Sequence, residues 1–140
     1  MLDWKVACTA PNQFFNTPSC YAIYVMGLNL AHMKAKGLQH YEDLAIKRST
    51  MLYNYIDNSE GYYTNPVDVK YRSRTNIPFR VKKDEKLEAE FVKQAIEFGL
   101  LELKGHRSVG GCRASCYNAL PITAVEALLE FMIKFKAANP

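Results

Sequence analysis

The sequence predicts an α/β fold, a two-layer α/β sandwich built on a small, largely antiparallel sheet. Helical and strand-like segments follow one another in the order α-α-β-β-α-β-β-α, with no long linker between them. The chain has 140 residues, of which 49% are hydrophobic, and this suits one domain with a proper core. We therefore expect residues 1–140 to form a single domain.

The start of the chain, from Met1 to Phe15, predicts an extended lead-in. This segment contains Pro11 and shows no clear hydrophobic period. Its strand-like stretch is WKVAC, so we expect a short strand at residues 4–8.

The next segment, NTPSCYAIYVMGLNLAHMKAKG at residues 16–37, predicts a long helix. Thr17 is a suitable N-cap, Pro18 suits the first helical position, and Gly37 is a typical stop. The helix is apolar on almost every side, so we expect it to be deeply buried or packed against a partner.

A second helix and a hairpin are expected next. Apolar residues recur at helical spacing from about His40 to Asp57. Beyond them, RTNIPFRVKK at residues 74–83 alternates apolar and polar residues as a strand does, and Pro78 favours an edge strand or a bulge. Pairing with GYYTNPVD at residues 61–68 would complete the hairpin.

Two strands and two further helices complete the prediction. Asp84 is a suitable N-cap for a helix that Gly99 ends. Strands are expected at LLELK, residues 100–104, and at RASCYNA, residues 113–119, and TAVE at residues 123–126 is a capping box for the last helix. The expected inward faces of these helices are Leu87, Phe91, Ala95 and Phe98, and Val125, Leu128, Leu129, Met132 and Phe135.

Composition excludes several classes of protein. The net charge is +4 and the basic residues are spread along the chain, which disfavours nucleic-acid binding. No apolar run reaches the roughly 20 residues that a membrane-spanning helix needs. The four cysteines show no CxxC spacing, and the first residues lack the pattern of a signal peptide. We therefore expect a cytoplasmic protein with no nucleic-acid and no membrane partner.

Residues 104–119, KGHRSVGGCRASCYNA, are the strongest candidate for a ligand site. The stretch contains no carboxylate and has four basic residues, Lys104, His106, Arg107 and Arg113. A guanidinium binds a carboxylate or phosphate through two parallel hydrogen bonds, and a loop with glycines lets a ligand approach closely. A small anion is the expected ligand. The alternative is a set of solvated loop cations, with His106 satisfied by a backbone carbonyl.

A second candidate is the start of the first long helix. Asn16 and Thr17 offer amide and hydroxyl groups beside the free backbone N–H groups and the helix dipole, which together favour phosphate. The alternative for Asn16-Thr17-Pro18 is a plain capping sequence.

Metal binding and nucleophilic catalysis are weaker candidates. His106, Cys112 and Cys116 could supply soft ligands, but a fourth ligand is missing. A cysteine nucleophile would need a residue to orient His106, and none is evident. We expect no metal site, and both cysteines to be small core residues.

Three stretches, NTPSCYAIYVMGL, NIPFRV and LKGHRSVGGCRASCYNAL, resemble the carboxyl-terminal part of the phosphoserine aminotransferase family. The resemblance runs over essentially the whole chain. It implies the C-terminal domain of the fold-type I, aspartate aminotransferase-like fold of transferases that depend on pyridoxal 5'-phosphate (PLP). It also implies a homodimer that interconverts phosphoserine plus 2-oxoglutarate with 3-phosphohydroxypyruvate plus glutamate, in L-serine biosynthesis, and it leaves open a related phosphorylated hydroxythreonine as a second substrate.

The resemblance also implies roles for individual residues. Asn16 and Thr17 would bind the cofactor phosphate of the neighbouring subunit. His106 and Arg107 would recognise the substrate phosphate, and Arg113 would pair with the substrate α-carboxylate. Ser19 stands where the family usually has a second proline, and we expect little effect of this difference.

The family's Schiff-base lysine lies on a large domain that precedes the matched region. On this resemblance, residues 1–17 are the lead-in from that domain, and the chain contains no catalytic residue. We therefore expect the isolated chain to be inactive as a transaminase. The alternative is a non-catalytic module, derived from the enzyme, that binds an anion or forms dimers.

Overall fold

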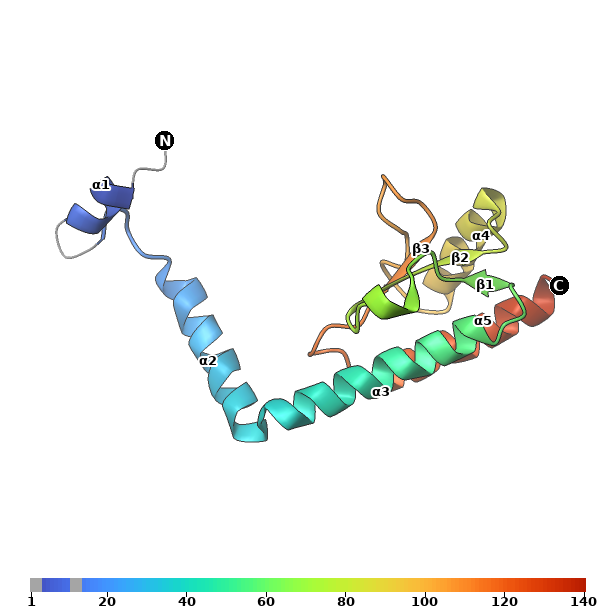
Figure 1. The fold of residues 1–140 in the computed structure, drawn as a ribbon, viewed down its shortest axis with the longest axis horizontal. Coiled ribbons are helices and arrows are strands. Elements are labelled where there is room, and N and C mark those ends of the chain that lie inside the picture. Colours follow the sequence, from blue (N-terminus) through green and yellow to red (C-terminus); the bar gives the residue numbers. More distant parts are fainter. Residues whose placement is uncertain (1–3, 11–13) are drawn as a thin grey trace. The chain divides into compact units, whose positions relative to one another are not determined.

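A computed structural model describes residues 4–10 and 14–140 (Figure 1). The chain divides into two compact units, Met1–Leu38 and Gln39–Pro140, and each is described by itself. In the described parts of both units, no helix is long and apolar enough to span a membrane.

The first unit contains helices α1, Trp4–Thr9, and α2, Cys20–Lys36. The strand expected at WKVAC is wrong, because these residues form α1, in which the Thr9 hydroxyl donates to the Lys5 carbonyl oxygen across 2.8 Å. A strand needs a paired neighbour, whereas a helical turn makes its hydrogen bonds within itself.

Helix α2 begins later than the sequence predicts. Its N-cap is Ser19, which makes no side-chain capping hydrogen bond, so the expected N-cap at Thr17 and first turn at Pro18 are wrong. The Cys20 N–H donates to the Pro18 carbonyl oxygen across 2.9 Å, which leaves Pro18 in the entry turn. The expected stop at Gly37 is confirmed, with φ of 82° and its N–H bonded to the Met33 carbonyl oxygen.

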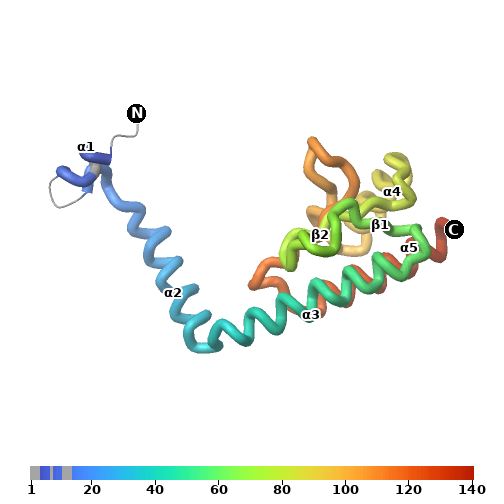
Figure 2. The backbone as a smooth tube through the Cα atoms, in the orientation of Figure 1, coloured from blue at the N-terminus to red at the C-terminus, as the bar shows by residue number. Residues whose placement is uncertain are grey.

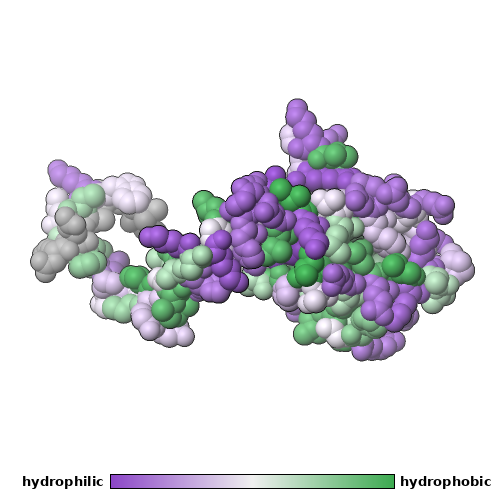
Figure 3. All heavy atoms as spheres, turned by 90° about the horizontal axis from the view of Figure 1, so that it is seen from below, coloured by the Kyte–Doolittle hydropathy of each residue, from purple (hydrophilic) through white to green (hydrophobic). Residues whose placement is uncertain are grey.

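None of the residues of α2 is buried within this unit. Figure 3 shows some green, apolar residues on the surface of this unit. The exposed large hydrophobic residues of α2 are Tyr21, Ile23, Tyr24, Met26, Leu28 and Leu30. The expected deep burial is therefore not met by the described residues, since α1 and α2 form no core between them. Packing against a partner stays a prediction.

The second unit is a three-stranded antiparallel sheet with three long helices (Figure 2). The helices are α3, Leu38–Asp57, α4, Glu85–Glu97, and α5, Ile122–Ala138, and a short 3-10 helix, η2, covers Val69–Tyr71. The strands are β1, Tyr63–Thr64, β2, Asn76–Val81, and β3, Cys112–Ser115, in the order β1-β2-β3. The expected strand at LLELK is largely wrong: of these residues Lys104 alone makes a bridge, to Cys112.

One face of the sheet is buried and the other is not. Ile77, Phe79 and Val81 of β2 are buried, and the residues between them are half-buried. In β3 the buried residues are Cys112 and Ala114. The core extends from this face to Leu52, Ile56, Phe91, Ala95, Val125, Leu128, Phe131, Met132 and Phe135 of the helices. The expected two-layer arrangement is confirmed.

Pro78 lies in the central strand, so its expected edge position is wrong. It pairs with Arg113, whose N–H points away from β2 and donates to the Leu103 carbonyl oxygen across 2.8 Å. The pair therefore requires no N–H from Pro78 toward β3. On the other side β1 ends at Thr64, and the Pro78 carbonyl oxygen accepts the Asn65 side-chain amide.

The two expected caps in this unit have different outcomes. The Asp84 carboxylate accepts from the backbone N–H groups of Lys86 and Leu87 and caps α4, as expected. The expected capping box at Thr123 is wrong, because α5 starts at Ile122 with Pro121 as N-cap and no side-chain capping bond.

Candidate functional site

The basic stretch forms a tight loop that projects from the sheet between Lys104 and β3 (orange in Figure 1). The Gly105 N–H donates to the Gly111 carbonyl oxygen across 2.9 Å and closes the neck of the loop. Gly110 and Gly111 have φ of 73° and 68°, a backbone region that favours glycine. Both glycines therefore suit the return of the loop to β3.

Arg113 lies on the open face of the sheet and lines a hollow of about 440 Å³, called here the Arg113 hollow. Its side chain is half-buried, and its Nε atom is buried without a hydrogen-bond partner among the described residues. A buried guanidinium N–H without a partner is costly unless a ligand or water satisfies it. This nitrogen therefore lacks an acceptor, which an anion could supply. The lining residues are Pro66, Val67, Tyr71, Ser73, Asn76, Pro78, Gly105, His106, Val109, Gly110, Cys112 and Arg113.

The structure brings His106 to the same hollow as Arg113 but leaves Arg107 outside its lining. The His106 ring is exposed, and its Nδ1 lies 2.7 Å from the Ser108 hydroxyl oxygen. This contact occupies Nδ1 and leaves Nε2 as the ring nitrogen for a ligand. Arg107 is exposed on the turn that follows. Two of the three predicted substrate residues thus share one hollow.

Asn16 and Thr17 lie in the other compact unit, on the segment before α2. Both side chains are exposed. Because Ser19 makes no side-chain capping bond, the first N–H groups of α2 have no partner from that cap. The residue types and the free helix start fit a phosphate group.

The cysteines of the loop region do not form a reactive or metal-binding group. Cys112 and Cys116 are both buried. Burial raises the pKa of Cys112 to about 12 and also raises the pKa of Cys116, so both stay protonated at neutral pH. Across residues 4–10 and 14–140, no group of His, Cys, Asp and Glu is arranged to hold a metal ion. Their expected role as core residues is confirmed.

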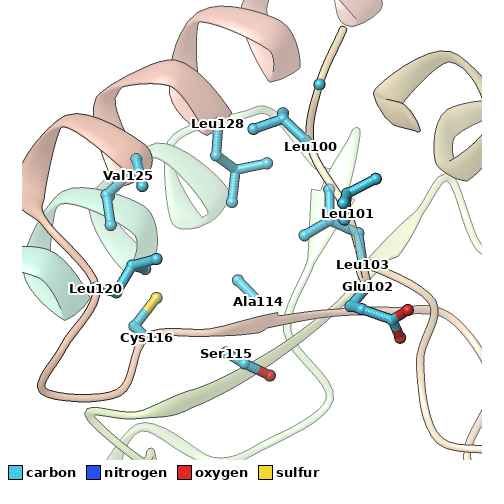
Figure 4. Close-up of a pocket in the computed structure, with 12 residues that line it drawn as sticks. Leu100, Leu101, Glu102, Leu103, Ala114, Ser115, Cys116, Leu120, Val125 and Leu128 are labelled. Atoms are coloured by element: carbon cyan, nitrogen blue, oxygen red, sulfur yellow. The ribbon is translucent and has the colours of Figure 1, made fainter. Parts of the chain in front are cut away.

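A second hollow, of about 310 Å³, lies between residues 99–103, the end of β3 and α5 (Figure 4). Leu100, Leu128 and the Cys116 sulfur point into it, while the Glu102 carboxylate points away. Among the described residues that line it, Glu102 alone is charged. An apolar hollow without a cation does not suit an anionic substrate, so the Arg113 hollow is the better candidate.

Sequence reasoning missed the wall of the Arg113 hollow that faces the loop. Pro66, Val67 and Tyr71 come from the connection between β1 and β2. Asn65 shapes this connection, since its side chain accepts from the Val67 N–H and donates to the Pro78 carbonyl oxygen, both across 2.7 Å. The available signal was Asn65-Pro66, a turn-forming pair directly after a strand.

Known proteins with sequences similar to this chain are phosphoserine aminotransferases. The enzyme from Laribacter hongkongensis is 47% identical over 96% of this chain and 37% of its own length. Phosphoserine aminotransferase 2, chloroplastic, of Arabidopsis thaliana is 44% identical over 99% of this chain and 33% of its own length. The chain therefore spans about a third of the curated relatives that it matches.

Solved structures confirm the predicted fold class. Phosphoserine aminotransferase from Bacillus circulans subsp. alkalophilus has a TM-score of 0.88 and 43% identity, over 92% of this chain and 36% of that one. A PLP-bound phosphoserine aminotransferase from Trichomonas vaginalis has a TM-score of 0.80 and 39% identity, over 87% of this chain and 35% of that one. Residues 3–128 match the family model described as aminotransferase class-V. The chain belongs to the class-V aminotransferase family.

Proposed function

We propose that this chain is the carboxyl-terminal part of a PLP-dependent phosphoserine aminotransferase and that it recognises the substrate. The complete enzyme would convert phosphoserine plus 2-oxoglutarate to 3-phosphohydroxypyruvate plus glutamate, as a cytoplasmic homodimer. The names of the relatives support this reaction. In this proposal residues 1–140 are the small domain, residues 1–17 are its lead-in from the large domain, and the Schiff-base lysine belongs to that large domain.

The observation that carries the proposal is the Arg113 hollow. Arg113 lines the same hollow as His106, and its buried Nε has no hydrogen-bond partner among the described residues. Phosphoserine carries a carboxylate and a phosphate at opposite ends, so it needs cations that are held apart. In our proposal Arg113 binds the carboxylate, and His106 and Arg107 bind the phosphate from the adjoining turn.

The cofactor would be PLP, with Asn16 and Thr17 at its phosphate in the neighbouring subunit. The start of α2 supports this, since an uncapped helix N-terminus offers N–H groups to an anion. When bound, PLP supplies an electron sink for chemistry at the substrate α-carbon. The residues of this chain would hold the phosphate and orient the substrate.

The direct test is thermal unfolding of the 140-residue chain with phosphoserine. We expect phosphoserine to raise the midpoint temperature, because a ligand that binds the folded state alone stabilises it. The variant Arg113→Ala should lose this protection. Equal protection of wild type and Arg113→Ala would remove Arg113 from the site.

Two controls make the test specific. Serine lacks the phosphate and should protect much less than phosphoserine, since His106 and Arg107 would then have no anion to bind. Arg74→Ala removes an exposed arginine that pairs with Glu42 across 3.0 Å, far in sequence from the loop, and it should keep the protection. The isolated chain should also show no PLP-dependent transamination, and detectable turnover would contradict the placement of the lysine on another domain.

A further inference from the structure

Glu88 of α4 is a buried carboxylate at the end of the sheet, with a residue exposure of 5%. Its Oε1 accepts from Arg80 Nε across 2.5 Å and from the Val81 backbone N–H across 3.2 Å. The pairing of β2 with β3 ends with Phe79 opposite Cys112. Val81, at the end of β2, therefore has no residue of β3 opposite it. Glu88 therefore takes the place of a missing strand partner.

Filling that place with an ion pair to Arg80 costs desolvation free energy. A buried carboxylate loses hydration, and a buried ion pair adds little net stability compared with apolar residues of similar volume. What the pair supplies is a fixed direction for the Arg80 side chain. The hydrogen bond to Glu88 raises the pKa of Arg80, so the guanidinium stays charged.

The stem of Arg80 lies directly against Gly111. A Cβ atom at Gly111 would come within 2.6 Å of Arg80 Cδ and 2.8 Å of the Phe79 carbonyl oxygen. The backbone of Gly111 is therefore in close contact with β2, at a point that the Arg80 side chain covers.

Gly111 in turn holds the neck of the basic loop. Its carbonyl oxygen accepts the Gly105 N–H across 2.9 Å, and a Cβ at Gly105 would lie 2.7 Å from that oxygen. The two sides of the neck therefore come together at two glycines, where no side chain separates their backbones. The next residue after Gly105 is His106, whose carbonyl oxygen accepts the N–H groups of Val109 and Gly110.

We propose that Arg80, held by Glu88, is a positioning residue that fixes the neck of the loop at Gly105 and Gly111, and with it His106 and Arg107. The importance of this for ligand binding rests on the proposed function. The contact between Arg80 and the loop neck does not rest on the proposed function, so an experiment can disprove either one without the other.

The test uses the full 140-residue chain and amide hydrogen exchange, measured residue by residue by NMR. In Arg80→Ala we expect the Gly105 N–H to exchange about tenfold faster, as for the loss of one hydrogen bond to a charged group. Core amides such as those of Phe91 and Met132 should exchange at rates close to wild type. Arg80→Lys keeps the stem and a charge for Glu88, and should restore most of the protection.

Two further variants distinguish a loss of the contact at the loop neck from a general loss of folding. Glu88→Gln keeps an oxygen for the Val81 N–H but loses the ion pair, so it should also speed exchange at Gly105. Arg74→Ala, which breaks the exposed pair with Glu42, should leave the loop unchanged. Wild-type exchange at Gly105 in both Arg80→Ala and Glu88→Gln would overturn the inference, as would an equal acceleration of loop and core amides.

The ligand arm separates the inference from the proposed function. If phosphoserine protects the wild-type chain, Arg80→Ala should weaken its binding by about tenfold, because the loop cations lose their fixed placement. Undiminished phosphoserine binding by Arg80→Ala would refute the positioning role. If phosphoserine does not protect wild type, the proposed function fails, while faster exchange at Gly105 still supports the contact between Arg80 and the loop neck.

Discussion

Asn65 donates a side-chain amide N–H to the carbonyl oxygen of Pro78 across 2.7 Å, where β1 has ended and β2 continues. The same side chain accepts the Val67 N–H through its oxygen. One side chain thus replaces a strand partner for Pro78 and shapes the segment that lines the Arg113 hollow.

Asn65→Ala should lower the free energy of unfolding by about 1–2 kcal/mol, because it leaves a backbone acceptor and a backbone donor without partners. Urea unfolding at neutral pH measures this change. Asn58→Ala is the matched control, since its amide bonds the Asn54 carbonyl oxygen at an exposed helix end, and we expect less than about 0.5 kcal/mol. Equal losses for the two variants would show that the Asn65 bonds contribute nothing special.

Some features of the fold that depend on neighbouring residues were predicted correctly, whereas the caps at Thr17 and Thr123 were not. The alternation in β2, the Asp84 cap and the stop at Gly37 are local patterns, and all three are confirmed. The position of β2 in the sheet was wrong, because Pro78 is tolerated in a central strand where β1 has ended at Thr64 and the pair with Arg113 needs no N–H from Pro78. Such an arrangement follows from tertiary contact and has no local signature.

The candidate site was likewise predicted in part. The excess of positive charge identified His106 and Arg113, and both line one hollow. The opposite wall was missed because Val67 and Tyr71 carry no charge or motif that marks a ligand site. The Arg80–Glu88 pair was missed because its partners come from a strand and a helix, and spacing alone does not show that they meet.

Asp84 caps the start of α4, and its removal should lower the stability of the fold. Asp84→Ala should lower the free energy of unfolding by about 1 kcal/mol, since the N–H groups of Lys86 and Leu87 lose their acceptor. Asp84→Asn keeps a side-chain oxygen and should stay much closer to wild type. If both variants lose the same free energy in urea unfolding, the charge at the helix start, rather than the cap, carries the effect.

Arg48 is a fully buried cation that holds the chain after β3. Its Nη1 donates to the carbonyl oxygens of Tyr117, Asn118 and Leu120, with the Tyr117 distance at 3.0 Å. Arg48→Met should lower the free energy of unfolding by about 2 kcal/mol, because these bonds to a charged donor are lost. Lys47→Met, on the exposed side of α3, should change it by less than about 0.5 kcal/mol. The measurement is urea unfolding of both variants. Equal, small changes in the free energy of unfolding would show that Arg48 does not hold the chain after β3.

Cys112 links the stability of the fold to alkaline pH. Burial raises the pKa of its thiol to about 12 in the folded chain, whereas an unfolded thiol ionises near pH 8.5. Between these two values the unfolded state has released the proton and the folded state still binds it. Stability that is fully present below about pH 8.5 is therefore lost as the pH rises toward 12.

The share of Cys112 in this loss can be isolated with Cys112→Ala. Between pH 8 and pH 10 wild type should lose about 2 kcal/mol more than the variant, whatever the cost of the substitution at neutral pH, since alanine has no proton to release. Cys20→Ala removes an exposed thiol on α2 and should keep the wild-type slope. The measurement is the free energy of unfolding in urea at several pH values. Parallel curves for wild type and Cys112→Ala would mean that the thiol of Cys112 does not stay protonated in the folded chain.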